Sequence, residues 1–435
     1  MGAKASWRRT FFVVWLANLI TAIGMMSFLP FFPSLLRDLG VEGQASVRLW
    51  AGVCFGAAPL SATIMSPIWG ALGDRLGRKL MVVRSMLAIA FFVGAMAYVQ
   101  TPLQLLAMRL GQGLFSGFIP PSITLVSVAA PAERQGRIAG YLTTSLAIGG
   151  MLGPLLGGWI SIRSGSHQNV FHVVGALALL GAVLVALFAV EDKSLRRVAD
   201  KALDSSPVRS ALSALRGDMR DVLGNPVLRG AAGLVFALQL GMGAVNPVLE
   251  EYVVELFRGL DPMAERWSYW LQRLSTEPLD SVQKVSIFAT SLSFGAMAIA
   301  NLVFLPLWGR YGDLVGHRRA LRVCALGSVA SLLLQASVPS YPALLVGRFL
   351  MGAALAGVAP LAFGLAATVT VADRRGGAFG AVFSARTLAV AVGGATGGAL
   401  AGVLGVRAVM AISCVPVGLA LYSFAKSRKP QAKLS

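Results

Sequence analysis

The sequence predicts an all-α membrane protein with twelve transmembrane helices in two pseudo-symmetric six-helix bundles. Two observations predict this fold. Of the 435 residues, 56% are hydrophobic and only 13% are charged, whereas a soluble protein carries about 25% charged residues. A basic, glycine-rich segment between two apolar runs, at 70–79, recurs at 309–319. The composition therefore places the chain in a membrane, and the repeat divides it into two related halves.

Twelve stretches are apolar and long enough to cross a bilayer, which takes about 20 residues per helix. They lie at 10–36, 47–72, 79–99, 102–130, 134–161, 169–190, 227–256, 282–308, 319–338, 341–370, 375–404 and 407–425. The first is too long for a signal-peptide core, so we expect it to be retained as a span. The third and ninth contain Arg84 and Arg322 about one turn from an end, where a long side chain can reach the interface.

The distribution of positive charge orients these helices. With the N-terminus inside, 27 of the 38 Lys and Arg residues lie in cytoplasmic segments or at the adjoining span ends, eight lie in outer loops or at outer span ends, and three lie deeper within spans. Cytoplasmic loops of membrane proteins carry the positive excess, so we expect both termini in the cytoplasm. The same distribution argues against nucleic-acid binding, because the bases form no patch with interleaved aromatic residues.

The repeat extends beyond the glycine-rich segment. Asp313 lies 239 residues after Asp74, and Arg348 lies 239 residues after Arg109. Three glycines of the fifth span recur 240 residues later. Parallel repeats of this kind occur in transporters whose binding site lies between the halves, near the bilayer midplane. We predict an N-terminal bundle at 1–190, a cytoplasmic linker at 191–226 and a C-terminal bundle at 227–435.

Two connecting segments have a composition of their own. In the linker, a Ser-Ser-Pro sequence at 205–207 resembles a helix start, and apolar residues at helical spacing follow it. An amphipathic helix on the inner membrane surface and a solvated linker both fit this pattern. The outer loop at 257–280 contains Trp267, Tyr269 and Trp270, which is typical of an interfacial aromatic anchor more than of a lid over a substrate.

Three segments resemble motifs of the major facilitator superfamily, at the relative positions that the family has. The segment at 70–79 is similar to motif A, Arg109 with Gln112 and Gly113 is similar to motif B, and the run G-G-M-L-G-P-L-L-G-G at 149–158 is similar to motif C of antiporters. The likeness is greatest to the drug:proton antiporter branch, which includes multidrug-resistance exporters of the bacterial inner membrane. The resemblance implies the major facilitator fold, a multi-pass protein of that membrane, and drug export driven by proton entry.

The motif A segment has the charges of a conformational latch. A carboxylate in a glycine-rich turn can accept hydrogen bonds from helix N-terminal amides and pair with arginines of the other bundle in one conformation only. The alternative is an orientation signal with a tight turn, and the repeat favours the latch. The latch residues are Gly70, Gly73, Asp74, Arg75, Gly77, Arg78 and Lys79, with Asp313 in the second half.

The glycine–proline run of the fifth span predicts close helix packing. Glycines remove side chains from the contact, and the proline removes a backbone donor and allows a local bend. The resemblance implies that this run seals antiporters against leakage. Its residues are Gly149, Gly153, Pro154, Gly157 and Gly158.

Two arginines within spans need partners, because a guanidinium facing lipid is costly. Arg109 either modulates proton release from a nearby carboxyl group or is satisfied by carbonyls or amides of adjacent spans. Arg386 either faces the substrate cavity, where it would attract anionic groups, or hydrogen bonds to a neighbouring helix.

Proton antiport generally needs a carboxyl group that titrates inside the membrane, and no acid lies in the middle of a span. The nearest candidates are Glu250 and Glu251, near the outer end of the seventh span. With Arg109 they are the predicted proton-relay residues, although their depth alone favours a solvated helix end. Asp74 is a third candidate, at the inner surface, and a mechanism without proton coupling stays open.

The candidate residues of the substrate cavity are mostly apolar or aromatic, which suits a flexible site for varied amphiphiles and argues against a hydroxyl-rich sugar. They are Asn18, Met25, Met26, Phe28, Phe236, Gln239, Met242 and Arg386. Core packing is the more usual role of such residues.

We therefore predict a secondary active transporter that exports amphipathic drugs or similar small molecules in exchange for protons, by alternating access. The alternatives are an importer or facilitator of another solute, such as a sugar, organic anion or metabolite, and a non-transporting membrane receptor or scaffold. We expect no enzyme activity, since there is no phosphate-binding loop, and no metal, since the three cysteines and three histidines lack ligand spacing. We expect the proton gradient to be the energy source and expect no cofactor. We expect a monomer whose partners are the substrate, protons and the bilayer.

Overall fold

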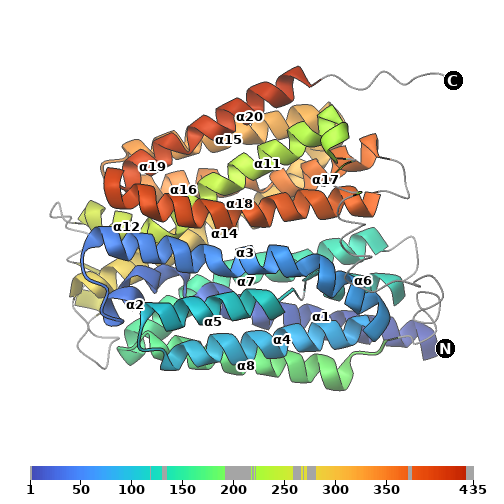
Figure 1. Cartoon of the computed structure of the whole chain (residues 1–435), viewed down its shortest axis with the longest axis horizontal. Coiled ribbons are helices and arrows are strands. Elements are labelled where there is room, and N and C mark those ends of the chain that lie inside the picture. The colour runs from blue at the N-terminus through green and yellow to red at the C-terminus, as the bar shows by residue number, and fades with distance from the viewer. Residues whose placement is uncertain are drawn as a thin grey trace. The chain divides into compact units, whose positions relative to one another are not determined.

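The computed structural model describes residues 2–117, 119–129, 135–191, 217, 220, 222–257, 266–267, 269–271, 281–370 and 375–427. Among these residues, eleven helices are long and apolar enough to cross a membrane. Figure 1 shows the elements in chain order, from α1 to α20. The structure therefore confirms the all-helical membrane architecture that the composition predicts.

The helices of the first half follow the predicted spans. They are α1 (Gly2–Ser27), the 3-10 turn η1 (Leu29–Phe31), α2 (Phe32–Asp38), α3 (Gln44–Leu76), α4 (Arg78–Ala95), η2 (Met96–Tyr98), α5 (Pro102–Phe115), α6 (Ile119–Ala129), α7 (Gln135–Ser164) and α8 (Gln168–Phe188). The predicted fourth span, 102–130, is divided between α5 and α6, and Gly117 after α5 has a positive φ of 118°. Neither piece is long enough alone to be one of the eleven spanning helices, which explains the difference from twelve.

The second half repeats this order. Its helices are α11 (Pro226–Val245), η5 (Asn246–Val248), α12 (Leu249–Phe257), α14 (Ser281–Val315), α15 (His317–Ser337), α16 (Tyr341–Leu355), α17 (Val358–Val369), α18 (Arg375–Leu404), α19 (Val406–Ile412) and α20 (Cys414–Lys426). The side chain of Asn225 accepts hydrogen bonds from the amides of Val227 and Leu228. This N-cap and the proline that follows it explain why α11 begins at Pro226.

A proline interrupts the first helix of each half at an equivalent place. Pro30 lies in η1 between α1 and α2, and Pro247 lies in η5 between α11 and α12. A proline cannot donate the backbone hydrogen bond that a continuous helix needs. Each helix is therefore interrupted near its C-terminal end, and α12 carries Glu250 and Glu251 beyond that interruption.

The chain forms two compact units. Unit 1 contains residues 1–41, 60–212 and 260–295, and unit 2 contains 42–59, 213–259 and 296–435. Two helices, α3 and α14, are thus divided between the units, which the sequence did not predict. The domain boundaries at 190 and 226 stay a prediction, because residues 192–216 lie outside the described part of the chain. The predicted amphipathic linker helix falls on the same undescribed residues.

Each unit is built around one closely packed helix pair. In unit 1, α1 packs against α7 and α8, and α4 lies beside α5 and α8 (Figure 1). In unit 2, α11 packs against α18 and α20, and α15 packs against α16. The interiors are apolar, with Phe31, Met86 and Phe171 fully buried in unit 1 and Leu234, Tyr252 and Cys324 in unit 2.

Candidate functional site

The glycine–proline run lies on α7, where it allows a close approach of α1. A Cβ atom added to Gly149 would lie 2.9 Å from the amide nitrogen of Ile23, and one added to Gly153 would lie 2.6 Å from the carbonyl oxygen of the same residue. At Gly157 an added Cβ would collide with the carbonyl oxygen of Ser27. These backbones are in contact along two turns, which is the close packing that the sequence predicts. The sealing role stays a prediction.

Unit 2 has the equivalent contact between α18 and α11. A Cβ atom added to Gly393 would lie 3.0 Å from the carbonyl carbon of Leu240, and one added to Gly397 would collide with Ala244. Gly398 packs against the first part of α3, where its added Cβ would lie 2.9 Å from the Cα atom of Gly52. The glycines that recur in the sequence therefore make equivalent close helix contacts in the two units.

The motif A segment is mostly helical. Gly70 and Gly73 lie within α3, and the turn is reduced to Gly77, whose φ of 106° is in the region that favours glycine. Gly316, the equivalent residue of the second half, has a φ of 89°. The side chains of Asp74 and Arg75 lie outside the described part of the structure. The latch assigned to this segment stays a prediction.

A carboxylate that the sequence analysis missed caps the helix after this turn. Glu191, just beyond α8, accepts hydrogen bonds from the backbone amides of Arg78 at 2.6 Å and Lys79 at 3.3 Å. These are the first amides of α4, which have no partner within their own helix. In the second half Asp313 is exposed, and its Oδ1 atom lies 3.7 Å from the Nε2 atom of His317. Glu191 thus ties the last helix of the first half to the motif A turn.

We expect Glu191→Gln to weaken this tie. A neutral amide keeps one hydrogen bond but loses the attraction between a negative charge and the helix N-terminus, so the free energy of unfolding should fall by about 0.5–1 kcal/mol. Unfolding of the purified protein in increasing dodecyl sulfate measures the change. Glu42→Gln, at an exposed position, is the matched control and should have no effect. Equal stabilities for the two variants would contradict the capping role.

The two arginines of the repeat are buried and have amide partners. Arg109 donates a hydrogen bond of 2.6 Å to the side-chain oxygen of Gln112, and its guanidinium lies 5.2 Å from the ring centroid of Phe28. Arg348 donates from both terminal nitrogens to the side-chain oxygen of Asn246, at 3.4 and 3.3 Å. Arg348 therefore has a side-chain amide from another span as its partner, whereas the amide that Arg109 contacts belongs to its own helix, α5. A role of Arg109 in proton release stays a prediction.

The acidic pair Glu250–Glu251 is buried, so the expectation of a solvated helix end is wrong. Only 1% of Glu250 and 2% of Glu251 is exposed. The Nη2 atom of Arg48, on α3, lies 3.9 Å from the Oε2 atom of Glu251, and its Nη1 atom donates 2.8 Å to the carbonyl oxygen of Ala401. Depth along the helix misled the prediction because it takes no account of tertiary packing, and here Arg48 of α3 lies against both Glu251 and the backbone of α18. Buried carboxylates next to a cation are groups whose protonation responds to conformation.

The candidate cavity residues differ in how far they are buried. Asn18 is buried and accepts a hydrogen bond of 3.1 Å from Ser122. Phe28 is 2% exposed, and its ring packs against Phe32 and Phe171. Met242 is buried as well, whereas four candidates are partly exposed and Arg386 is exposed. The four partly exposed residues are Met25, Met26, Phe236 and Gln239.

Exposure separates these candidates into three groups: buried, partly exposed and exposed. Asn18, Phe28 and Met242 have the burial of packing residues, so a place for them in the cavity stays a prediction. Arg386 is exposed on α18, and both interpretations of this arginine, in the cavity or hydrogen bonded to a neighbouring helix, stay predictions.

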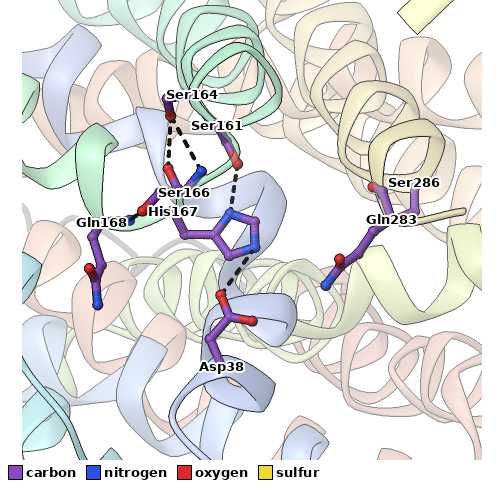
Figure 2. Close-up of polar contacts among 8 residues, drawn as sticks. All are labelled: Asp38, Ser161, Ser164, Ser166, His167, Gln168, Gln283 and Ser286. Carbon is purple, nitrogen blue, oxygen red and sulfur yellow. Dashed lines mark hydrogen bonds and ion pairs between the residues drawn. The ribbon is translucent and has the colours of Figure 1, made fainter. Parts of the chain in front are cut away.

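The sequence analysis missed three interactions that join distant segments. They are Arg48 with Glu251, Glu191 with the start of α4, and a cluster of Asp38, Ser161 and His167, which Figure 2 shows. His167 is one of only three histidines in the chain.

Comparison with known proteins decides the family. A sequence profile described as Major Facilitator Superfamily matches residues 14–261 and 231–435. The chain belongs to the major facilitator superfamily. Its members are transporters that carry small molecules through the membrane, and this multi-pass protein is therefore a transporter of that superfamily.

Relatives in this superfamily include named multidrug transporters. The chain is 30% identical to "Multidrug resistance protein MdtG" of Dickeya zeae strain Ech586, over 81% of this chain and 78% of the relative. It is also 30% identical to "Multi-drug resistance efflux pump PmrA" of Streptococcus pneumoniae serotype 4, over 80% of this chain and 78% of the relative.

Solved structures show the same fold in transporters of varied solutes. The human organic anion transporter MFSD10 (TETRAN) matches with a TM-score of 0.67 and 20% identity, covering 96% of this chain and 99% of that one. A D-xylose–proton symporter matches with a TM-score of 0.71 and 17% identity, covering 96% and 97%. These similarities confirm the major facilitator fold, and at such identities they carry no information on the substrate.

Proposed function

We propose that this superfamily member exports amphipathic compounds from the bacterial cytoplasm in exchange for protons, with both termini on the cytoplasmic side of the inner membrane. The names of relatives at 30% identity support drug efflux. The excess of Lys and Arg in alternate loops supports the orientation. The energy source is the proton gradient, with no resident cofactor.

The observation that carries proton coupling is the burial of Glu250 and Glu251. A buried carboxylate is stabilised in its charged form by a nearby cation and in its neutral form by desolvation. Arg48 supplies the cation, 3.9 Å from Glu251. Protonation of Glu251 removes this attraction, so it loosens the contact between α12 and the first part of α3. Proton binding at this place is thereby linked to movement of a helix divided between the two units.

The proposed substrates are amphipathic because the candidate cavity residues that are partly exposed combine flexible and aromatic side chains. Met25, Met26 and Phe236 can adapt to varied apolar shapes, and Gln239 adds one polar contact. Arg386, exposed on α18, favours substrates that carry an anionic or strongly polar group. The motif A segment acts as the latch between conformations.

The experiment is substrate-triggered proton flux in proteoliposomes that contain the purified protein and a pH-sensitive dye. A panel of lipophilic cations, neutral drugs and amphipathic anions is added in turn. We expect a pH change that requires both protein and substrate, and that Asp74→Asn abolishes because the latch loses its charge. Transport without proton movement would leave a facilitator and overturn antiport. Absence of flux for every class of compound would favour an importer or a non-transporting protein.

A further inference from the structure

Two helices of unit 2, α15 and α20, pack side by side along their length (Figure 1). At one end the Nη2 atom of Arg318 donates a hydrogen bond of 2.8 Å to the carbonyl oxygen of Phe424. Further along, the Sγ atom of Cys414 lies 3.8 Å from the carbonyl oxygen of Val329. The two helices are therefore antiparallel, and the start of α15 lies beside the end of α20.

Arg318 fixes the end of α20. Its Nη2 atom also donates to the carbonyl oxygens of Ala425, at 3.3 Å, and Ser427. Carbonyls in the last turn of a helix have no partner within that helix, so one guanidinium satisfies several of them. Arg318 therefore holds the end of α20, and any side chain on it, at a fixed place beside the first turns of α15.

Three further bases surround this contact. Arg319 and Arg322 follow Arg318 on α15, and Lys426 lies in the end of α20 that Arg318 holds. Arg319 and Lys426 are exposed, and Arg322 is partly exposed. Within the described part of the chain, no carboxylate pairs with any of these three bases; Asp313, an acid at the same end of unit 2, lies beside a histidine. The three form a basic group whose charge no described acid balances.

Exposed apolar side chains continue from the basic group along both helices. They are Val323 and Leu326, one turn apart on α15, and Leu419 and Tyr422, one turn apart on α20. The ammonium nitrogen of Lys426 lies 4.3 Å from the ring centroid of Tyr422, and tyrosine is typical of the level at which lipid headgroups lie. An apolar strip that ends in bases and an aromatic ring matches the two parts of a phospholipid, the acyl chains and an anionic headgroup.

The equivalent end of unit 1 has a different charge. Arg318 lies 239 residues after Lys79 of α4, and α8 ends in Phe188 where α20 ends in Lys426. Beyond α8, the carboxylate of Glu191 accepts hydrogen bonds from the first amides of α4. The chain itself thus supplies an anion at this end of unit 1. The excess of bases at the end of unit 2 is therefore not a consequence of the internal repeat.

We propose that Arg319, Arg322 and Lys426 bind the phosphate of an anionic phospholipid, whose acyl chains lie along the exposed apolar side chains of α15 and α20. Guanidinium groups bind phosphate oxygens through paired hydrogen bonds. The ligand is a lipid and not free phosphate, because the apolar strip begins where the bases end. The choice of the cytoplasmic leaflet rests on the proposed orientation, but the site does not rest on drug efflux, since a facilitator would bind the same lipid.

Lipid binding to the purified full chain in a neutral detergent, measured by native mass spectrometry, tests the proposal. Phosphatidylglycerol should bind more tightly than phosphatidylethanolamine with the same acyl chains. Arg322→Gln/Lys426→Gln should weaken phosphatidylglycerol binding at least about tenfold and leave phosphatidylethanolamine binding unchanged. Arg163→Gln/Arg266→Gln, which removes two exposed bases from unit 1, is the matched control and should bind like the wild type. Equal affinities of the wild type for the two lipids, or of the two double variants for phosphatidylglycerol, would overturn the proposal.

Photo-crosslinking locates the bound lipid. Phosphatidylglycerol with a photoactivatable headgroup, incorporated in nanodiscs with the full chain, should label the segments 317–326 and 419–427. Excess unlabelled phosphatidylglycerol should reduce this labelling, whereas excess glycerol 3-phosphate should not. Labelling confined to other helices, or removed by glycerol 3-phosphate, would overturn the assignment to a lipid. If the double variant does not fold, Lys426→Gln, at an exposed position, should reduce labelling of both segments. None of these measurements requires transport, so failure of the proposed efflux would leave their outcome unaffected.

Discussion

Replacement of Glu251 by glutamine should abolish substrate-driven proton flux while leaving substrate binding intact. An amide has the shape and hydrogen-bonding ability of a protonated carboxyl group but cannot release a proton. The variant therefore imitates the protonated, neutral form of Glu251 permanently. Its side chain should contact Arg48 as the protonated carboxyl group of the wild type would. Proton flux in proteoliposomes should fall to the level of protein-free liposomes, and equilibrium binding of the same substrate should change little.

The neighbouring helix turn offers a matched control. Glu255 lies on the same helix, α12, but its side chain is 43% exposed and pairs with Arg407 at 3.0 Å. Exposed ion pairs of this kind contribute about 0–1 kcal/mol, so Glu255→Gln should transport like the wild type. Glu250→Gln and the double variant Glu250→Gln/Glu251→Gln separate the contributions of the two carboxylates. If the double variant still couples substrate to protons, the buried acidic pair is not the coupling site.

This prediction depends on a contact that the sequence could not show. The spans were predictable, because long apolar runs and a repeat at constant offset specify the helices and their order. The partner of Glu251 was not, since Arg48 lies about 200 residues away, on the part of α3 that belongs to unit 2. Helix depth alone predicted a solvated end, whereas tertiary packing buried it.

The motif A segment shows the same limit of sequence-based prediction over a short stretch of chain. The sequence predicted a turn at 70–79, and the structure confines it to Gly77 because α3 continues to Leu76. The sequence shows where the glycines of this segment are, but it does not show which of them adopts a positive φ. Nor could they reveal that the acid capping α4 is Glu191, since that pairing requires the end of α8 to lie beside the turn.

Replacement of Gly157 by alanine should severely disturb unit 1, although it adds only one methyl group. The added Cβ would collide with the carbonyl oxygen of Ser27, and backbone atoms in a helix cannot move aside as a flexible side chain can. Overpacking of this kind costs about 1–3 kcal/mol, and separation of α1 from α7 would add to it. We expect a lower thermal midpoint in detergent and loss of transport.

The chain offers one control within α7 and one in a helix of unit 2. Nothing lies within 4 Å of a Cβ atom added to Gly150 on α7, or to Gly418 on α20. Alanine is favoured over glycine within a helix by about 1 kcal/mol, so Gly150→Ala and Gly418→Ala should be neutral or slightly stabilising. Gly397→Ala, which collides with Ala244 in unit 2, should behave like Gly157→Ala.

The comparison of these four variants distinguishes a role of the motif C glycines in helix packing from a role in the transport cycle. If close packing is the purpose of the repeated glycines, Gly157→Ala and Gly397→Ala should lose stability to similar extents, because each forces apart the helix pair at the centre of its unit. If Gly157→Ala loses transport but keeps the thermal midpoint of the wild type, the glycine serves the transport cycle and not the fold. Equal stabilities for Gly157→Ala and Gly150→Ala would contradict the backbone contact between α1 and α7 itself.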